Sequence, residues 1–145
     1  MMYDFVEIND GHRNQISHWS YGGGYMCFDM EKNYADLYDL INTEKYEGFV
    51  AVNDEDEIIG VLECYIDEDC IQIANALAPE FIGKGLGLDF INNCIDFIVE
   101  SYEYARENIV IYLRPNNSKA MNLYERAGFI DVDESEEWIK MELSI

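Results

Sequence analysis

Alternating apolar and polar positions predict seven strands, and apolar residues spaced three and four apart predict four helices. The strands are expected at residues 3–8, 46–52, 58–66, 70–77, 108–113, 129–132 and 138–143. The helices are expected at residues 12–19, 34–41, 88–102 and 117–127. Asp10 is the expected cap of the first helix and Asn116 or Asn117 that of the last, which Gly128 ends.

The order of these elements, β-α-α-β-β-β-α-β-α-β-β, contains no internal repeat and no linker. Strands that follow one another through short acidic turns are expected to pair antiparallel. Strands 70–77 and 108–113 are instead joined through the longest helix, which requires a parallel, right-handed crossover. The pattern therefore predicts one α+β domain over residues 1–145 with a mixed central sheet.

Composition excludes several classes of protein. No apolar run reaches the roughly 18 residues of a membrane span, and the chain starts without the basic and apolar stretches of a signal peptide. Its four cysteines lack C-x-x-C spacing and form no zinc-ligand pattern with histidine. We therefore expect a cytoplasmic protein with free thiols and no metal site.

Net charge narrows the choice of partners. Thirty acidic residues against nine basic ones give a formal charge of −21. Binding to nucleic acid or to an anionic membrane needs clustered Lys and Arg, so neither is expected. Long-range attraction favours cationic partners, although much of this charge can serve solubility alone.

A glycine-rich loop between strand 70–77 and the longest helix carries the clearest chemistry. Its glycines alternate along Gly83-Lys84-Gly85-Leu86-Gly87. Such a loop can turn backbone N–H groups toward one point, and the following helix adds the positive end of its dipole. This arrangement suits a pyrophosphate. A Walker A loop would need Lys-Ser/Thr after the last glycine, and the Rossmann spacing does not match either.

Two motifs resemble the GNAT superfamily of N-acetyltransferases. Residues 77–87 are similar to that family's acetyl-CoA loop, except that Ile82 stands where Arg or Gln is usual. Residues 117–129 resemble its second motif, N-x-x-A-x-x-L-Y-x-x-x-G-F. The spacing of the motifs and the order of elements match the family over essentially the whole chain. The resemblance implies a GNAT fold and acetyl-CoA as acyl donor.

The resemblance also implies a site. In this family the fourth and fifth strands splay apart and the cofactor arm lies in the gap. Implied cofactor contacts are Asn75, Ala76, Leu77, Ile82, Gly83, Lys84, Gly85, Leu86, Gly87, Asn117, Lys119 and Tyr124. Asn117 can equally be only a helix cap, and Lys119 an ordinary surface charge.

Tyr124 and Glu63 are the leading candidate catalysts. Tyr124 falls at the family's usual general-acid position, although a core tyrosine would fit the same apolar helix face. Glu63 lies within the apolar run of strand 58–66 and is the candidate general base, with Glu80 as a weaker one. Strand alternation alone leaves a solvent-facing Glu63 at least equally open.

The acceptor is expected to be an amine. Residues 84–126 hold five basic and six acidic residues, whereas the rest of the chain holds four basic and 24 acidic ones. This contrast favours a cationic small molecule or peptide end. Its expected walls are Trp19, Tyr21, Tyr25, Asp29 and the acidic turn at 133–137. A non-catalytic acyl-CoA-binding or regulatory module is the alternative function, and edge strands would allow a homodimer.

Overall fold

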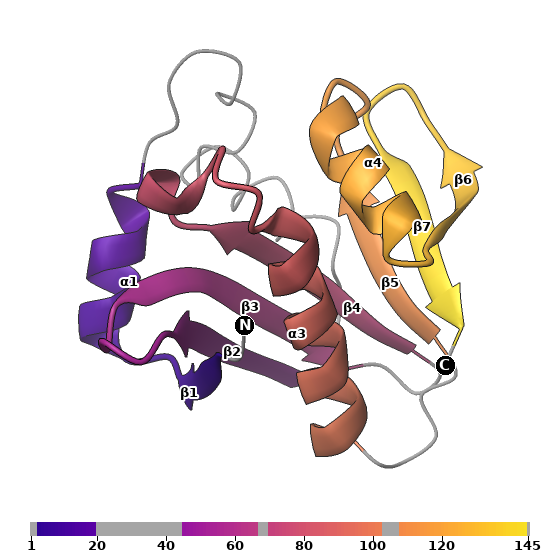
Figure 1. Cartoon of the computed structure of the whole chain (residues 1–145). Coiled ribbons are helices and arrows are strands. Elements are labelled where there is room, and N and C mark those ends of the chain that lie inside the picture. Colours follow the sequence, from indigo (N-terminus) through magenta and orange to yellow (C-terminus); the bar gives the residue numbers. More distant parts are fainter. Residues whose placement is uncertain (1–2, 20–44, 67–69, 103–107, 145) are drawn as a thin grey trace.

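The structure is a computed structural model that describes residues 3–19, 45–66, 70–102 and 108–144 (Figure 1). Its elements are β1 (Asp4–Glu7), α1 (Asp10–Ser17), β2 (Lys45–Val52), β3 (Ile58–Ile66), β4 (Cys70–Leu77), the short helix η2 (Pro79–Phe81), α3 (Gly87–Ser101), β5 (Asn108–Leu113), α4 (Ser118–Arg126), β6 (Ile130–Glu134) and β7 (Ile139–Ser144). The predicted helix at 34–41 and the glycines at 22–24 lie outside the described residues.

The strands form one mixed, seven-stranded sheet in the order β1-β2-β3-β4-β5-β7-β6. Among the described strands, only β4 and β5 pair parallel, and α3 lies between them in the sequence; the other neighbours pair antiparallel. The predicted α+β class and mixed sheet are therefore confirmed. The parallel pair is the place where the sheet changes direction, and it positions the site.

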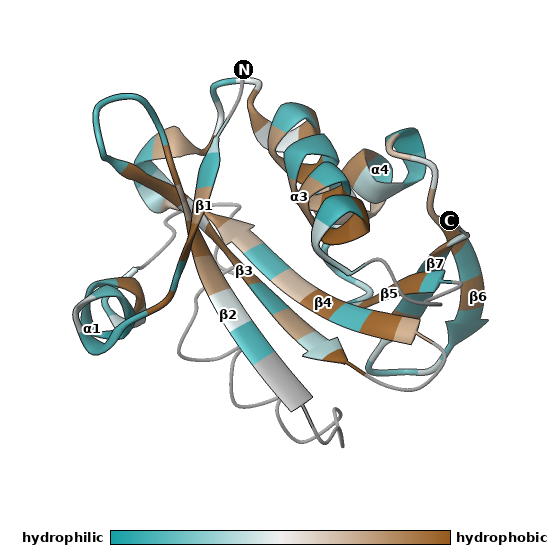
Figure 2. Cartoon of the chain, turned by 90° about the horizontal axis from the view of Figure 1, so that it is seen from below, coloured by the Kyte–Doolittle hydropathy of each residue, from teal (hydrophilic) through white to brown (hydrophobic). Residues whose placement is uncertain are grey.

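Helices cover the two faces of the sheet unequally (Figure 2). The face under α3 and α4 carries the larger core, which includes Leu62 of β3 and Phe90 of α3. The opposite face carries a smaller cluster, in which Ile16 of α1 packs with Val50 and Val61. Helix α1 therefore lies on the other side of the sheet from α3.

Local chemistry explains the ends of two helices. Asn9, rather than the expected Asp10, caps α1: its side chain accepts a hydrogen bond from His12 N, and His12 Nδ1 accepts one from Asn9 N. Asp10 is wrong as the cap because it is the first helical residue. Gly128 follows α4 with a φ of 109°, as expected of the residue that ends a helix.

Candidate active site

Strands β4 and β5 part midway along their length. Their parallel pairing runs from Cys70 opposite Asn108 to Ile73 opposite Ile111. Beyond that point β4 continues to Leu77 and β5 to Leu113. The backbone of residues 74–77 on the side of β5 is therefore not paired with it. This is the gap that the resemblance implied.

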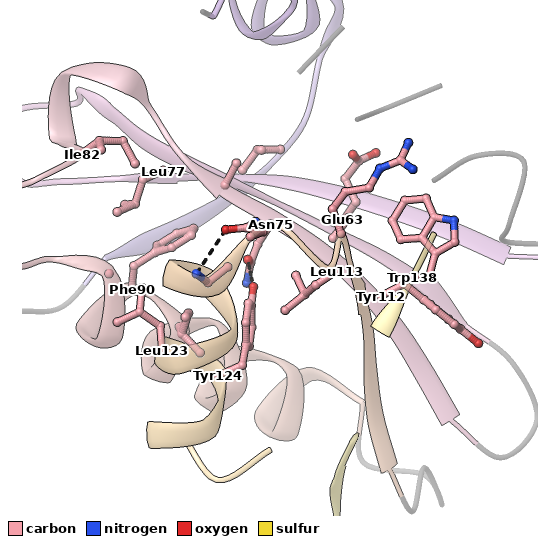
Figure 3. Close-up of a pocket in the computed structure, with 18 of the residues that line it drawn as sticks. Glu63, Asn75, Leu77, Ile82, Phe90, Tyr112, Leu113, Leu123, Tyr124 and Trp138 are labelled. Atoms are coloured by element: carbon pink, nitrogen blue, oxygen red, sulfur yellow. Dashed lines mark hydrogen bonds between the residues drawn. The ribbon is translucent and has the colours of Figure 1, made fainter. Parts of the chain in front are cut away.

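A cavity of about 130 Å³ occupies this gap and passes between the two faces of the sheet. Figure 3 shows Ile82, Leu77, Phe90 and Leu123 at one end, and Glu63, Tyr112 and Trp138 at the other. Asn75, Leu113 and Tyr124 lie between the two ends. Residues from β3, β4, α3, β5 and α4 thus converge on one small space.

Tyr124 and Asn75 face each other on the α3 side of the gap. Tyr124 is 3% exposed, and its hydroxyl donates a hydrogen bond to Asn75 Oδ1. Burial, together with the nearby Cys94 thiol, raises the pKa of Tyr124. The phenol is consequently held neutral and pointed at β4.

The amide nitrogen of Asn75 is the second polar atom of this side chain. Its Nδ2 is buried and has no hydrogen-bond partner among the described residues. A buried amide without a partner is costly, by roughly 1–3 kcal/mol. Because Asn75 lines the cavity, a ligand with a carbonyl group would supply the missing acceptor.

Glu63 lies on the opposite face. It is 2% exposed, so the solvent-facing alternative is wrong. Its partner across β4 is Ala74, whose small side chain leaves room for the carboxylate. Tyr65, two residues along the same face of β3, donates a hydrogen bond of 3.5 Å to Glu63 Oε2. Glu63 and Tyr124 therefore approach one cavity from opposite sides of the sheet.

Sequence reasoning missed several residues of this cavity, among them Tyr112, Arg114 and Trp138. Tyr112 and Arg114 alternate with the core residue Leu113, and hence share the face of Glu63. The Arg114 guanidinium lies 4.3 Å from the centre of the Trp138 ring. Alternation along β5 could have indicated the face, but the meeting of Arg114 with Trp138 depends on the pairing of β5 with β7.

The glycine loop borders a second, wider hollow of about 600 Å³ between η2, α3 and α4, hereafter the loop groove. Gly83 and Gly85 have φ values of 79° and 75°, in the left-handed region that favours glycine. A Cβ on Gly87 would approach Leu123 Cδ1 to 2.7 Å, so this glycine allows α3 and α4 to pack closely.

The loop groove has the polarity of an anion site. Helix α3 begins at Gly87, and Leu86 before it provides no side-chain cap, which leaves the first N–H groups to an external acceptor. Lys119 and Arg126 of α4 line the same groove, and so does one carboxylate, Asp89 in the first turn of α3. Lys84 instead places its ammonium 5.4 Å from the centre of the Phe81 ring. Its predicted contact with a cofactor stays a prediction.

Ile82 lies between the loop groove and the cavity, and Asn117 lies between the cavity and the start of α4. Ile82 lines both hollows and packs against both core clusters. Asn117 is 7% exposed and accepts a hydrogen bond of 3.2 Å from Ala120 N, so its role as a helix cap is confirmed. It also lines the cavity, and its predicted cofactor contact remains untested.

The expected acceptor walls are placed only in part. Trp19 is half-buried against the cluster of Ile16, Val50 and Val61 and does not line the cavity formed by described residues. Tyr21, Tyr25 and Asp29 lie outside the described residues. The acidic turn is exposed, and Ser135 within it binds the backbone of Trp138 through Ser135 N to Trp138 O at 2.8 Å.

Other classes of site receive no support within the described ranges. No helix there is both long enough and apolar enough to cross a membrane. The same residues contain no group of three His, Cys, Asp or Glu side chains that could hold a metal ion. Cys64, Cys70 and Cys94 form no disulfide with one another. The homodimer stays a prediction.

Comparison with known proteins agrees with this geometry. Residues 14–129 match the Acetyltransferase (GNAT) family, so the chain belongs to that family of acetyltransferases. A spermidine N(1)-acetyltransferase of Vibrio cholerae is 27% identical over 131 residues, which cover 88% of this chain and 72% of the relative.

Solved structures share the fold over nearly the whole chain. The Campylobacter jejuni N-acetyltransferase PseH superposes with a TM-score of 0.72 at 23% identity, covering 99% of both chains. PseH has also been solved in complex with acetyl coenzyme A. The Vibrio cholerae spermidine N-acetyltransferase in complex with CoA and spermine has a TM-score of 0.69 at 19% identity, covering 99% of this chain and 95% of that one.

Proposed function

We propose that this protein transfers an acetyl group from acetyl-CoA directly to a primary amine. The observation that carries the proposal is the convergence of Glu63 and Tyr124 on one cavity from opposite faces of the sheet. One carboxylate can take a proton from the amine while a phenol on the other side supplies one to the leaving group.

The donor side suits acetyl-CoA by its chemistry. The loop groove offers uncapped N–H groups at the start of α3 together with Lys119 and Arg126, as a pyrophosphate requires. From there the gap in the sheet offers unpaired backbone and the spare Nδ2 of Asn75 to an amide-containing arm. When bound, acetyl-CoA supplies the acetyl group, forming a C–N bond as its C–S bond breaks.

Glu63 is the proposed general base. An alkyl amine has a pKa near 10.4, so making it neutral at pH 7 costs about 4.6 kcal/mol. A carboxylate that is 2% exposed and lines the cavity can accept that proton at Oε1 or Oε2. The long hydrogen bond of 3.5 Å from Tyr65 reaches Oε2 from the same face of β3.

Tyr124 is the proposed general acid. Its raised pKa keeps a proton on the hydroxyl throughout the physiological range. Asn75 Oδ1 holds that hydroxyl at the gap, and the hydroxyl can turn toward a developing thiolate without moving the ring. Asn75 therefore acts as a positioning residue.

The test combines binding with turnover. Thermal unfolding with acetyl-CoA at about 100 times its Kd should show a stabilisation of roughly 2.7 kcal/mol. Thiol release is then followed with a panel of cationic, neutral and anionic primary amines. A stabilisation without release on any amine would support the acyl-CoA-binding module, and no stabilisation would refute both functions.

We also propose that the reacting amine of the acceptor arrives as a positively charged ammonium group. The acidic exterior would attract it, and that attraction weakens as salt screens it. Equal rates for cationic and neutral amines, unchanged by salt, would contradict such steering.

A further inference from the structure

We infer that Asn75 is a catalytic residue in its own right, whose side-chain Nδ2 donates a hydrogen bond to the carbonyl oxygen of the donor's acetyl group. This inference rests on the proposed function and deepens it, because it adds a third side chain, besides Glu63 and Tyr124, that acts on the reacting atoms. The observation behind it is the buried Nδ2 of Asn75, which has no hydrogen-bond partner among the described residues although Asn75 lines the cavity.

Asn75 lies near the end of the gap at which the two strands are still paired. Strands β4 and β5 pair as far as Ile73 opposite Ile111, so Asn75 is two residues beyond the last pair. The loop groove meets the cavity at the other end of the gap, where Leu77 and Ile82 line both hollows. A donor whose pyrophosphate binds at the groove therefore passes Leu77 first, and its thioester end reaches Asn75.

Tyr124 places Asn75 beside the reacting sulfur by an independent argument. The Tyr124 hydroxyl donates a hydrogen bond to Asn75 Oδ1, and that hydroxyl is the proposed proton donor to the leaving sulfur. Nδ2 is two bonds away from Oδ1, and the carbonyl oxygen of a thioester is likewise two bonds away from its sulfur. An amide that holds Tyr124 at the sulfur can therefore bring its Nδ2 to the carbonyl oxygen.

The Cys94 thiol is a poor substitute for such an acceptor. Cys94 lies near the Asn75 side chain, and burial raises the pKa of Cys94 well above its ordinary value of 9.0. Its sulfur therefore stays a neutral thiol, which accepts hydrogen bonds only weakly. A buried N–H group gains more from a carbonyl oxygen, and gains most when that oxygen becomes charged.

The hydrogen bond from Asn75 would strengthen during the reaction. As the amine nitrogen bonds to the carbonyl carbon, an electron pair moves onto the carbonyl oxygen. The C=O bond re-forms as the C–S bond breaks; Tyr124 gives its proton to the sulfur, and Glu63 takes one from the nitrogen. Phe90 and Leu113 make the surrounding wall apolar, so the charge on the oxygen meets the Asn75 N–H group away from water (Figure 3).

The hydrogen bond itself can be tested without any acceptor. Acetyl-CoA that is isotope-labelled at the carbonyl carbon is bound to the protein, and its carbonyl stretch is measured by infrared difference spectroscopy. Asn75→Asp keeps an oxygen for the Tyr124 hydroxyl but loses the Nδ2 donor, and Asn75→Leu loses both. Because a hydrogen bond weakens the C=O bond, the stretch should lie at lower frequency in the original chain than in either variant. The same frequency in all three proteins would overturn the inference.

An analogue without the carbonyl identifies which group of the donor Asn75 binds. Calorimetry compares acetyl-CoA with its S-ethyl thioether, which has the same arm but no acyl oxygen. Asn75→Leu should weaken the binding of acetyl-CoA about five- to tenfold, and that of the thioether less than about twofold. An equal loss for both ligands would overturn the inference, because Asn75 would then bind an amide of the arm.

A double-mutant cycle separates the role of Nδ2 from the hold on Tyr124. Asn75→Leu should lower kcat about 10²-fold, and should still lower it at least about tenfold in a Tyr124→Phe background. A loss that disappears in that background would overturn the inference, because Asn75 would then act only through Tyr124. Gln72→Leu is the matched control: it removes another amide of β4, from a residue that does not line the cavity, and should leave kcat unchanged.

Spectroscopy separates this inference from the proposed transfer. If Asn75→Leu abolishes the shift of the carbonyl stretch, the hydrogen bond stands even when no thiol is released and the transfer is refuted. If thiol is released but neither the stretch nor the thioether comparison responds to Asn75→Leu, the inference is refuted while the transferase stands.

Discussion

The two faces of the sheet meet at the gap between β4 and β5, but their chemistry is built differently. On the α3 face, the glycines and backbone N–H groups that border the loop groove come from one short stretch of chain, and α4 completes the lining with Lys119 and Arg126. On the α1 face, Glu63, Arg114 and Trp138 come from three separate parts of the sequence. Under the proposed function, the donor is held mainly by backbone, whereas the acceptor is selected by side chains.

The largest effect is expected on the α1 face. Glu63→Gln keeps the shape of the side chain but removes the base, and should lower kcat by about 10²–10⁴ with acetyl-CoA affinity unchanged. The loss should shrink as pH rises toward the pKa of the amine, because the solution then removes the proton. Steady-state kinetics against pH measures both.

Glu80→Gln is the matched control, since Glu80 is exposed in η2 and does not line the cavity. It should leave kcat unchanged. A loss of less than about threefold for Glu63→Gln, under 1 kcal/mol, would show that a different group or a bound water serves as the base.

The next effect belongs to the α3 face and concerns stability at alkaline pH. Burial raises the pKa of Cys64 to about 12, from an ordinary value of 9.0, and burial also raises the pKa of Cys94. A raised pKa stabilises the folded state fully below the unfolded value, and this stability is lost as pH rises through the folded value.

Stability should therefore fall between pH 9 and pH 12, by up to about 4 kcal/mol from Cys64 alone. Chemical denaturation at several pH values measures the slope. Cys64→Ala should flatten it, with Cys70→Ala, at the half-buried start of β4, as the control. An unchanged slope in Cys64→Ala would mean that other groups, such as Tyr124, carry the effect.

Sequence reasoning succeeded best for features that are determined by residues close together in the sequence. The glycine loop, the start of α3 and the cap at Asn117 are set by neighbouring residues, so they could be predicted. Strand alternation also placed Glu63 on a definite face of β3. It could not show that this face is covered, since coverage depends on elements distant in sequence.

The same limit explains the residues that were missed or misplaced. Arg114 meets Trp138 only because β5 pairs with β7. The side chain of Lys84 lies against Phe81, which its place among the loop glycines did not indicate, and its contact with the cofactor stays a prediction. A helix cap can shift by one residue, as Asn9 shows, because adjacent polar residues compete for the same N–H groups.

A smaller effect should follow from changing the glycine loop. Gly85 has a φ of 75°, and a Cβ there would meet no atom within 4 Å, so Gly85→Ala costs only backbone strain. That cost is about 1–2 kcal/mol, and the loop should relieve it by moving, which weakens acetyl-CoA binding. Calorimetric titration with acetyl-CoA measures the change.

Gly85→Asn is the control, because asparagine tolerates the left-handed region better than alanine. It should bind acetyl-CoA more tightly than Gly85→Ala. If both variants bound like the original chain, the conformation of Gly85 would have no part in holding the donor.

The smallest effect distinguishes cations that line the loop groove from one that does not. Lys119→Ala and Arg126→Ala should each raise the KM for acetyl-CoA about two- to fivefold, as partly screened surface charges do. Lys84→Ala removes the same charge from a side chain that lies on Phe81, and should change KM less. Added salt should reduce the first two effects. If Lys84→Ala had the largest effect, the loop would rearrange on binding and Lys84 would leave Phe81 for the phosphates. The donor side would then depend on a charged side chain, as the acceptor side does. The contrast between the two faces would be lost.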